Sequence, residues 1–253
     1  MADPLRGSSS GQLPPPQTYD LEVVAVEDVS PAMRRIVLSS SALGEFDYRP
    51  GQDLMLKVES SGQLVNRRYT IRAWNATGGE VEINVVRHGM GPGARWAGSV
   101  RPGDRLPDVV APRGKITVDQ DAEWHLFLGD ETAVPAMFHM AESLPSPGTA
   151  RLLLEVGGEG DAPQPPPRVR DQVTFVSRDG LPPGDDQALI AAAARADLPS
   201  SRGRVYIAGE ARTALAIRDL LVGRGLSRER MAVKAYWRRD QPNLDRGEPE
   251  PAE

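Results

Sequence analysis

The sequence predicts a two-domain α+β protein, in which an antiparallel β-barrel comes first and a doubly wound α/β domain with a parallel sheet follows. Up to about residue 118, short β-prone segments succeed one another with turn residues between them. From about residue 124, strand-like and helix-like segments alternate. Consecutive strands favour a small barrel, whereas alternation favours a parallel sheet that helices cover on both faces. A chain of 253 residues is long enough for both domains.

Six segments rich in Val, Ile, Leu and aromatic residues make up the predicted barrel. Turn-forming runs such as Pro50-Gly51 and Pro102-Gly103-Asp104 separate them. The predicted strands span residues 21–29, 33–40, 52–60, 66–74, 80–88 and 104–112. One stretch breaks the pattern, because Gly91-Pro92-Gly93 is typical of a tight turn that opens a short helix.

The second half of the chain contains five predicted strands and three predicted helices. The strands span residues 124–130, 150–156, 172–177, 204–209 and 231–237, and the helices span 132–144, 186–196 and 211–222. A Pro-rich stretch over residues 157–170 is expected to be a loop that can move. Ligands of such sheets bind outside the carboxyl ends of the strands.

The two ends of the chain differ in composition from the rest. We expect a disordered segment over 1–17, a barrel domain over 18–120, an α/β domain over 121–240 and a flexible acidic tail over 241–253.

Composition excludes several function classes. The net charge of -5 leaves no basic footprint for nucleic acid. Without cysteine, the chain has no disulfide, iron–sulfur ligand or zinc thiolate, and its three histidines show no metal-ligand spacing. No apolar run approaches the roughly 20 residues of a membrane span, and the N-terminus has no secretory signal. We therefore expect a cytoplasmic monomer without a metal centre.

The most informative motif is the strand that contains residues 67–72, Arg-Arg-Tyr-Thr-Ile-Arg. Alternate side chains of a strand share a face, so Arg67 and Tyr69 point one way. Thr70 and Arg72 point the other way. An aromatic plane and a hydroxyl beside guanidinium groups suit a flat redox ring that carries a diphosphate. An edge strand with exposed arginines is the alternative interpretation.

Three further segments carry chemistry. The helix that starts after Gly91 offers backbone N–H groups and a partial positive charge to an anion, and a simple helix start is the alternative interpretation. Residues 129–136 and 208–211 follow predicted strands and lie at the carboxyl edge of the sheet. In the first of these, Asp130 either faces a ligand or caps the next helix.

Together these motifs resemble the siderophore-interacting proteins, which are flavin-dependent ferric-siderophore reductases of the ferredoxin-reductase class. The resemblance covers roughly residues 18–240. It rests on five segments in order, namely Arg67-x-Tyr69-Thr70-x-Arg72, His88 with Gly91-Pro92 and Trp96-Ala97, Gly129-Asp130-Glu131-Thr132-Ala133-x-Pro135-Ala136, Ala208-Gly209-Glu210, and Tyr236-Trp237-Arg238. The chain departs from the family pattern at Ala94, where a serine is usual, and in a turn after His88 that is one residue shorter.

The resemblance implies a non-covalently bound FAD. Tyr69 would pack against the isoalloxazine ring, Thr70 would contact its N5 edge, and Arg67 with Arg72 would hold the diphosphate. The segment from Tyr236 would close over the flavin. The expected FAD-binding residues are Arg67, Tyr69, Thr70, Arg72, His88, Gly91, Pro92, Gly93, Ala94, Trp96, Asp130, Thr132, Ala133, Tyr236 and Trp237.

The expected reaction is the reduction of Fe(III) in a siderophore, which releases Fe(II). Electron transfer needs no side-chain acid, base or nucleophile, so no catalytic residue is expected. A basic mouth for an anionic siderophore would consist of Lys57, Arg113, Lys234 and Arg238, although a solvated basic face is an equal alternative. The electron donor is NADH, NADPH or reduced ferredoxin.

Two other functions fit the same motifs. One is a reductase of the same architecture that acts on a flavin, a quinone or an electron-carrier protein, since fold alone does not fix function. The other is a flavin- or siderophore-binding protein without turnover.

Overall fold

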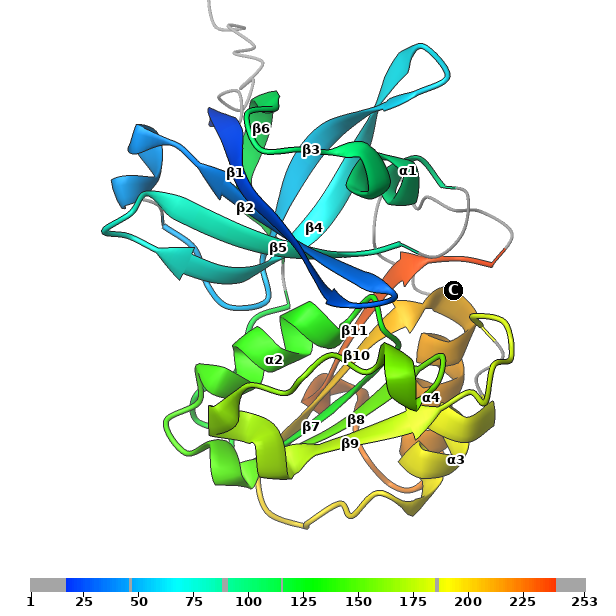
Figure 1. Ribbon diagram of the computed structural model, residues 1–253. Helices are drawn as coiled ribbons and strands as arrows, with labels where there is room; N and C mark the ends of the chain where they lie inside the picture. Colours follow the sequence, from blue (N-terminus) through cyan, green and yellow to red (C-terminus); the bar gives the residue numbers. More distant parts are fainter. Residues whose placement is uncertain (1–16, 46, 88–90, 115, 185–186, 240–253) are drawn as a thin grey trace, which may run out of the picture.

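The computed structural model describes residues 17–45, 47–87, 91–114, 116–184 and 187–239. Two bodies lie one above the other, a barrel built from the N-terminal half and a sheet domain built from the C-terminal half (Figure 1). The last strand of the sheet domain reaches up to the barrel. Within the described ranges, no helix is both long and apolar enough to cross a membrane.

The barrel is closed, and each of its strands is antiparallel to its neighbours. Its order is β1-β2-β5-β4-β3-β6, with β1 (Thr18–Ser30), β2 (Met33–Ser39), β3 (Asp53–Ser60), β4 (Gln63–Asn75), β5 (Glu80–Val86) and β6 (Arg105–Arg113). Alternate side chains of these strands fill the interior, where Leu54, Leu56 and Ile71 are fully buried. The short helix α1 (Pro92–Ser99) connects β5 to β6.

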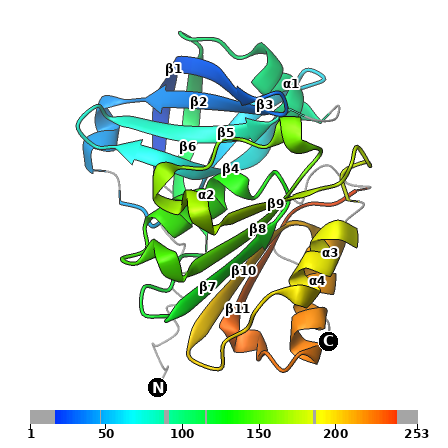
Figure 2. The same cartoon turned by 60° about the horizontal axis from the view of Figure 1, so that its bottom comes forward.

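The second domain is a five-stranded parallel sheet in the order β11-β10-β7-β8-β9. The strands are β7 (Trp124–Gly129), β8 (Ala150–Val156), β9 (Val173–Ser177), β10 (Gly203–Glu210) and β11 (Met231–Trp237). Helix α2 (Val134–Glu142) packs on one face, and α3 (Gln187–Arg195) and α4 (Ala211–Gly223) pack on the other (Figure 2). The all-buried pattern of β7 follows from this covering of both faces.

The predicted fold class is confirmed, including every predicted strand and helix. The Pro-rich stretch after β8 contains two 3₁₀ turns, η3 (Glu159–Asp161) and η4 (Pro167–Gln172), and the buried Val169 anchors the second turn. The proposed domain boundaries stay a prediction. The predicted terminal segments lie almost wholly outside the described residues.

Candidate functional site

The strand β4 presents the Arg-Arg-Tyr-Thr-Ile-Arg motif to two different surroundings. Arg67 and Tyr69 lie beside helix α1, on the barrel side. Thr70 and Arg72 lie on the opposite face and contact the sheet domain. Because successive side chains of a strand point to opposite faces, one half of the motif lies beside α1 and the other half contacts the sheet domain.

On the barrel side, Arg67, Tyr69, Gly93 and Trp96 form a group that we call the barrel-side cluster. The Tyr69 ring stacks on Trp96 with centroids 5.7 Å apart and an interplanar angle of 29°. A Cβ on Gly93 would lie 2.5 Å from the Tyr69 hydroxyl and 3.8 Å from Cδ of Arg67, so a larger residue would displace Tyr69. Among the described residues the Tyr69 hydroxyl is buried without a hydrogen-bond partner, and burial raises the pKa of Tyr69.

Helix α1 begins within this cluster. Gly91 is its N-cap in extended conformation, and no side chain caps the first turn. Pro92 occupies the first turn, where its missing N–H costs nothing. Ala94 adds no hydroxyl, so the backbone N–H groups of this turn are the donors that an anion would meet.

An ion cluster around the buried Asp53 carboxylate lies where β4 meets the sheet domain. The Asp53 carboxylate accepts from Arg68 Nη1 at 2.6 Å and from Lys234 Nζ at 2.6 Å. We call these three residues the Asp53 cluster. Next to it, the Thr70 and Tyr236 hydroxyls lie 3.3 Å apart, so the first motif touches the C-terminal motif.

Arg72 lies apart from Arg67. Its guanidinium forms a 2.7 Å ion pair with Glu142 of α2 and lies 6.0 Å from the centroid of the Phe138 ring. The two arginines were expected to hold one diphosphate together, but the structure does not bring them together. Their odd spacing along the strand places them on opposite faces.

At the carboxyl edge of the sheet, Asp130 is a hydrogen-bonding hub. One oxygen accepts from the Thr132 N–H at 2.9 Å and the Thr132 hydroxyl at 2.5 Å. The other accepts from the Glu210 N–H and from the Trp237 indole N–H, both at 2.8 Å. Burial and the neighbouring Glu131 carboxylate raise the pKa of Asp130, whereas the donated hydrogen bonds oppose that rise. Ala133, also expected at the flavin, is fully buried beside this turn.

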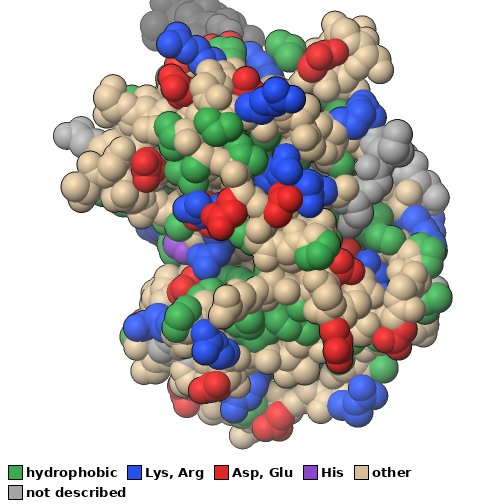
Figure 3. Space-filling model, viewed as in Figure 1, with side chains coloured by type: hydrophobic (Ala, Val, Ile, Leu, Met, Phe, Trp, Pro, Cys, Tyr) green, Lys and Arg blue, Asp and Glu red, His purple; other side chains and the backbone are tan. Residues whose placement is uncertain are grey.

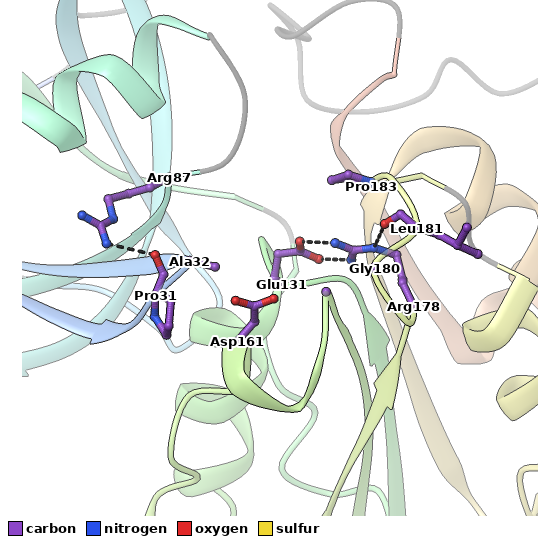
Figure 4. Close-up of a pocket in the computed structure, with 10 residues that line it drawn as sticks. Pro31, Ala32, Arg87, Glu131, Asp161, Arg178, Gly180, Leu181 and Pro183 are labelled. Atoms are coloured by element: carbon purple, nitrogen blue, oxygen red, sulfur yellow. Dashed lines mark hydrogen bonds and ion pairs between the residues drawn. The ribbon is translucent and has the colours of Figure 1, made fainter.

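A second buried ion group lies beside Asp130. Arg178 holds Glu131 through two hydrogen bonds of 2.5 and 2.8 Å, and its Nη1 also reaches Glu155 at 3.1 Å. Burial raises the pKa of Glu155 to about 7. Figure 4 shows the Glu131–Arg178 pair in the wall of a cleft of about 370 Å³ that opens between the barrel and the ends of β7, β8 and β9.

The four cations of the expected basic mouth do not form one surface. Lys234 is buried in the Asp53 cluster, and Lys57 forms an exposed 3.0 Å pair with Asp108. Arg113 is exposed and Arg238 is half-buried. On the face in Figure 3, basic and acidic side chains are interspersed.

One expected site residue is not described by the structure, and three ion-paired residues were not expected from the sequence. His88 lies outside the described residues. Sequence reasoning missed Asp53, Arg178 and Glu155, because their ion partners come from distant segments and no local spacing signals them.

Comparisons with known proteins agree with this two-part architecture. A model described as "Siderophore-interacting FAD-binding domain" matches residues 51–116, and one described as "Siderophore-interacting protein" matches residues 122–240. The ferric vibriobactin reductase ViuB of Vibrio cholerae is 30% identical over 181 residues, which span 69% of this chain and 65% of ViuB. The match therefore covers slightly less than two thirds of that relative's length.

Two other similar proteins match over more of their length. The NADPH-dependent ferric-chelate reductase of Escherichia coli K12 is 25% identical over 249 residues, covering 86% of this chain and 92% of the relative. The solved structure of a siderophore utilization protein from T. fusca has 31% identity and a TM-score of 0.80, and the match covers 92% of this chain and 97% of that one. With both halves matched in order and a structural relative of nearly full length, the chain belongs to the siderophore-interacting protein family.

Proposed function

We propose that this protein is an FAD-dependent oxidoreductase that reduces Fe(III) in a ferric siderophore and so releases Fe(II). The observation that carries the proposal is the barrel-side cluster, which combines an aromatic face, a guanidinium and an uncapped helix start. The cluster lies within the stretch that matches an FAD-binding domain. The names of the V. cholerae and E. coli relatives, both ferric reductases, support the choice of substrate.

The described residues fit FAD on two counts. The buried Tyr69 hydroxyl has no hydrogen-bond partner among the described residues, and a bound group would supply one. The Tyr69 hydroxyl fills the space next to Gly93, so the first turn of α1 and the aromatic ring lie side by side, as a ligand with both a ring and a diphosphate requires. Arg67 and the first turn of α1 would hold the diphosphate, Tyr69 would contact the ring, and Thr70 would reach the edge of the ring from the strand backbone.

Bound FAD would supply the electrons, which pass singly to Fe(III). The protein would orient the cofactor and exclude water from it, without a side chain that transfers a proton. The Thr70–Tyr236 contact and the Asp53 cluster would fix the sheet domain against the barrel beside the ring. Fe(II) binds hard oxygen ligands more weakly than Fe(III), so reduction releases the metal.

Solvent-accessible cations would attract an anionic siderophore to the protein. Arg113 and Arg238 are the proposed cations that attract an anionic siderophore, because neither forms an ion pair with a carboxylate within the described ranges. Lys57 remains a weaker proposal, since Asp108 already neutralises it. NADH, NADPH and reduced ferredoxin are the proposed electron donors, and the name of the E. coli relative supports NADPH.

The test begins with purified, flavin-loaded protein that is reduced chemically without oxygen. A ferric siderophore is then added together with a ferrous-iron trap. We expect the oxidised flavin spectrum to return as trapped Fe(II) appears. The gallium complex of the same siderophore is the matched control, because Ga(III) has a similar size and charge but is not reduced. Flavin that stays reduced with iron, or that reoxidises equally with gallium, would contradict the proposal.

A further inference from the structure

The place where the parallel sheet would bind a dinucleotide can be identified from its topology. In a doubly wound sheet, ligands lie at the carboxyl ends of the two strands where the strand order reverses. Here those strands are β7 and β10, because β8 and β9 extend to one side of β7 while β10 and β11 extend to the other. The diphosphate of a dinucleotide would normally take the backbone N–H groups of the turns after these strands.

In this chain the Asp130 carboxylate already occupies that place. It accepts the Thr132 N–H of the turn after β7 and the Glu210 N–H at the end of β10. The indole of Trp237 closes the same position with a third hydrogen bond. Gly209, at φ +133°, has no room for a Cβ, which would lie 2.5 Å from Asp130 Oδ2. The carboxylate and the backbone are therefore packed together without space for a phosphate.

The neighbouring anion-binding groups are also filled by carboxylates of the chain. Glu210 caps α4 by accepting from the Arg212 and Thr213 N–H groups at 2.5 and 3.0 Å. Arg178, the buried cation at this edge, is held by Glu131 and Glu155. In Figure 4 the Arg178 guanidinium faces Glu131 directly. The Thr132, Glu210, Arg212 and Thr213 N–H groups and the Arg178 guanidinium are thus each satisfied by a carboxylate of the chain.

We propose that Asp130 is a resident anion that excludes the diphosphate of a pyridine dinucleotide from the β7–β10 crevice. The inference rests on the proposed function, since it concerns the reductant of that same enzyme. NADH and NADPH then reduce the flavin without first forming a bound complex with the protein. The rate of flavin reduction therefore rises linearly with their concentration and does not saturate. A reductant that works at low concentration must be recognised by something other than a diphosphate in this crevice.

The first test measures binding rather than turnover. FAD-loaded wild-type protein is titrated calorimetrically with NADPH, with NADH and with inorganic pyrophosphate. We expect no saturable binding of any of the three below millimolar concentrations. Saturable NADPH binding that pyrophosphate displaces would overturn the proposal. The ferric-reduction assay uses chemically reduced flavin and no dinucleotide, so the two proposals fail separately.

The second test vacates the crevice. Asp130→Ala frees the Thr132 and Glu210 N–H groups, and we expect pyrophosphate to bind about tenfold or more tightly than to wild type. Asp161→Ala is the matched control, because it removes a carboxylate from the adjoining cleft without freeing either N–H group. An equal gain from Asp161→Ala would mean that charge, not occupancy, excludes the anion.

Flavin content and the thermal midpoint establish whether Asp130→Ala is folded, and Asp130→Ser replaces it if it is not. A folded variant that gains no pyrophosphate affinity would overturn the assignment. The wild-type titration decides the question independently if both variants fail to fold.

Discussion

Arg67 and Arg72 are both arginines of strand β4, but they have different neighbours. Arg67 lies against the start of α1 and is the charged member of the barrel-side cluster, whose other members are Tyr69, Gly93 and Trp96. Arg72 is ion-paired with Glu142 and packs on Phe138. We therefore propose Arg67, and not Arg72, as the arginine that holds a phosphate group, because Arg72 joins the barrel to α2.

Single substitutions separate these two roles. Arg67→Ala should weaken FAD binding roughly 10- to 100-fold, because it removes hydrogen bonds to a charged group. Arg72→Ala should keep FAD affinity and lower the free energy of unfolding by about 1 kcal/mol or more, because Glu142 loses its partner. Fluorescence titration of the apoprotein with FAD and urea unfolding measure the two effects. Equal loss of FAD affinity in both variants would show that both arginines hold the diphosphate.

Glu155 gives a prediction about pH. Burial raises its pKa from 4.5 to about 7, and its Oε2 has no hydrogen-bond partner in the described part of the chain. The folded protein therefore holds a proton that the unfolded chain releases between these two pKa values. The free energy of unfolding falls as pH rises through that window, by at most roughly 3 kcal/mol.

Glu155→Gln removes this titration. We expect the stability of wild type relative to the variant to decrease steadily from about pH 5 to about pH 8. Urea unfolding of both proteins at matched ionic strength measures the difference. Parallel pH profiles would mean that Arg178 keeps Glu155 ionised throughout the range.

At the scale of elements, the contact of α1 with Tyr69 depends on one glycine, Gly93. The Tyr69 hydroxyl lies over Gly93, whereas a Cβ on Gly98 in the same helix would meet nothing within 4 Å. Because position 93 has no Cβ, the start of the helix packs directly against the Tyr69 side chain, whereas Gly98 plays no part in that contact. This close approach brings the uncapped first turn next to Arg67.

Two glycine substitutions test this approach. Gly93→Ala should displace Tyr69, lower stability by about 1–3 kcal/mol and weaken FAD binding. Gly98→Ala should leave FAD binding unchanged and shift stability by no more than about 1 kcal/mol in either direction. Thermal unfolding and FAD titration of both variants provide the comparison. If Gly93→Ala behaves like Gly98→Ala, then Tyr69 moves freely and the cradle is not a rigid site.

The sequence predicts elements well here because their signals are local. The two-residue period of β5 and the apolar run of β7 each report burial within a few positions. The partner of Arg72 is not encoded locally, because Glu142 lies on a helix of the other domain. Likewise, Lys234 looks like a surface cation in sequence, and only the fold brings it to Asp53. The sequence therefore predicted the strands and helices but not which charges neutralise one another.

At the scale of the whole molecule, one face of β4 supplies several of the contacts that join the barrel to the sheet domain. Arg68 reaches the sheet domain through Asp53, Thr70 contacts Tyr236, and Arg72 pairs with Glu142. The opposite face of the strand belongs to the barrel-side cluster. A change in how the two domains meet would shift β4 and so move Tyr69 and its neighbours on the other face of the strand.

Two lysine pairs of similar length differ sharply in exposure. The Lys234 and Asp53 side chains are 10% and 3% exposed, whereas those of Lys57 and Asp108 are 37% and 61% exposed. Lys234→Met should lower the free energy of unfolding by about 1–3 kcal/mol, because Asp53 is left with Arg68 alone. Lys57→Met should cost less than about 1 kcal/mol. Urea unfolding measures both, and equal effects would mean that the Asp53 cluster does not hold the domains together.

The Asp53–Lys234 pair joins residues 181 positions apart in the chain. During translation at about 5 to 20 residues per second, Asp53 emerges roughly 10 to 35 s before Lys234. Arg68 emerges almost at once and neutralises the carboxylate in the meantime. The barrel side of the interface therefore has its charge balanced by Arg68 first, and Lys234 completes the contact only after β11 has emerged.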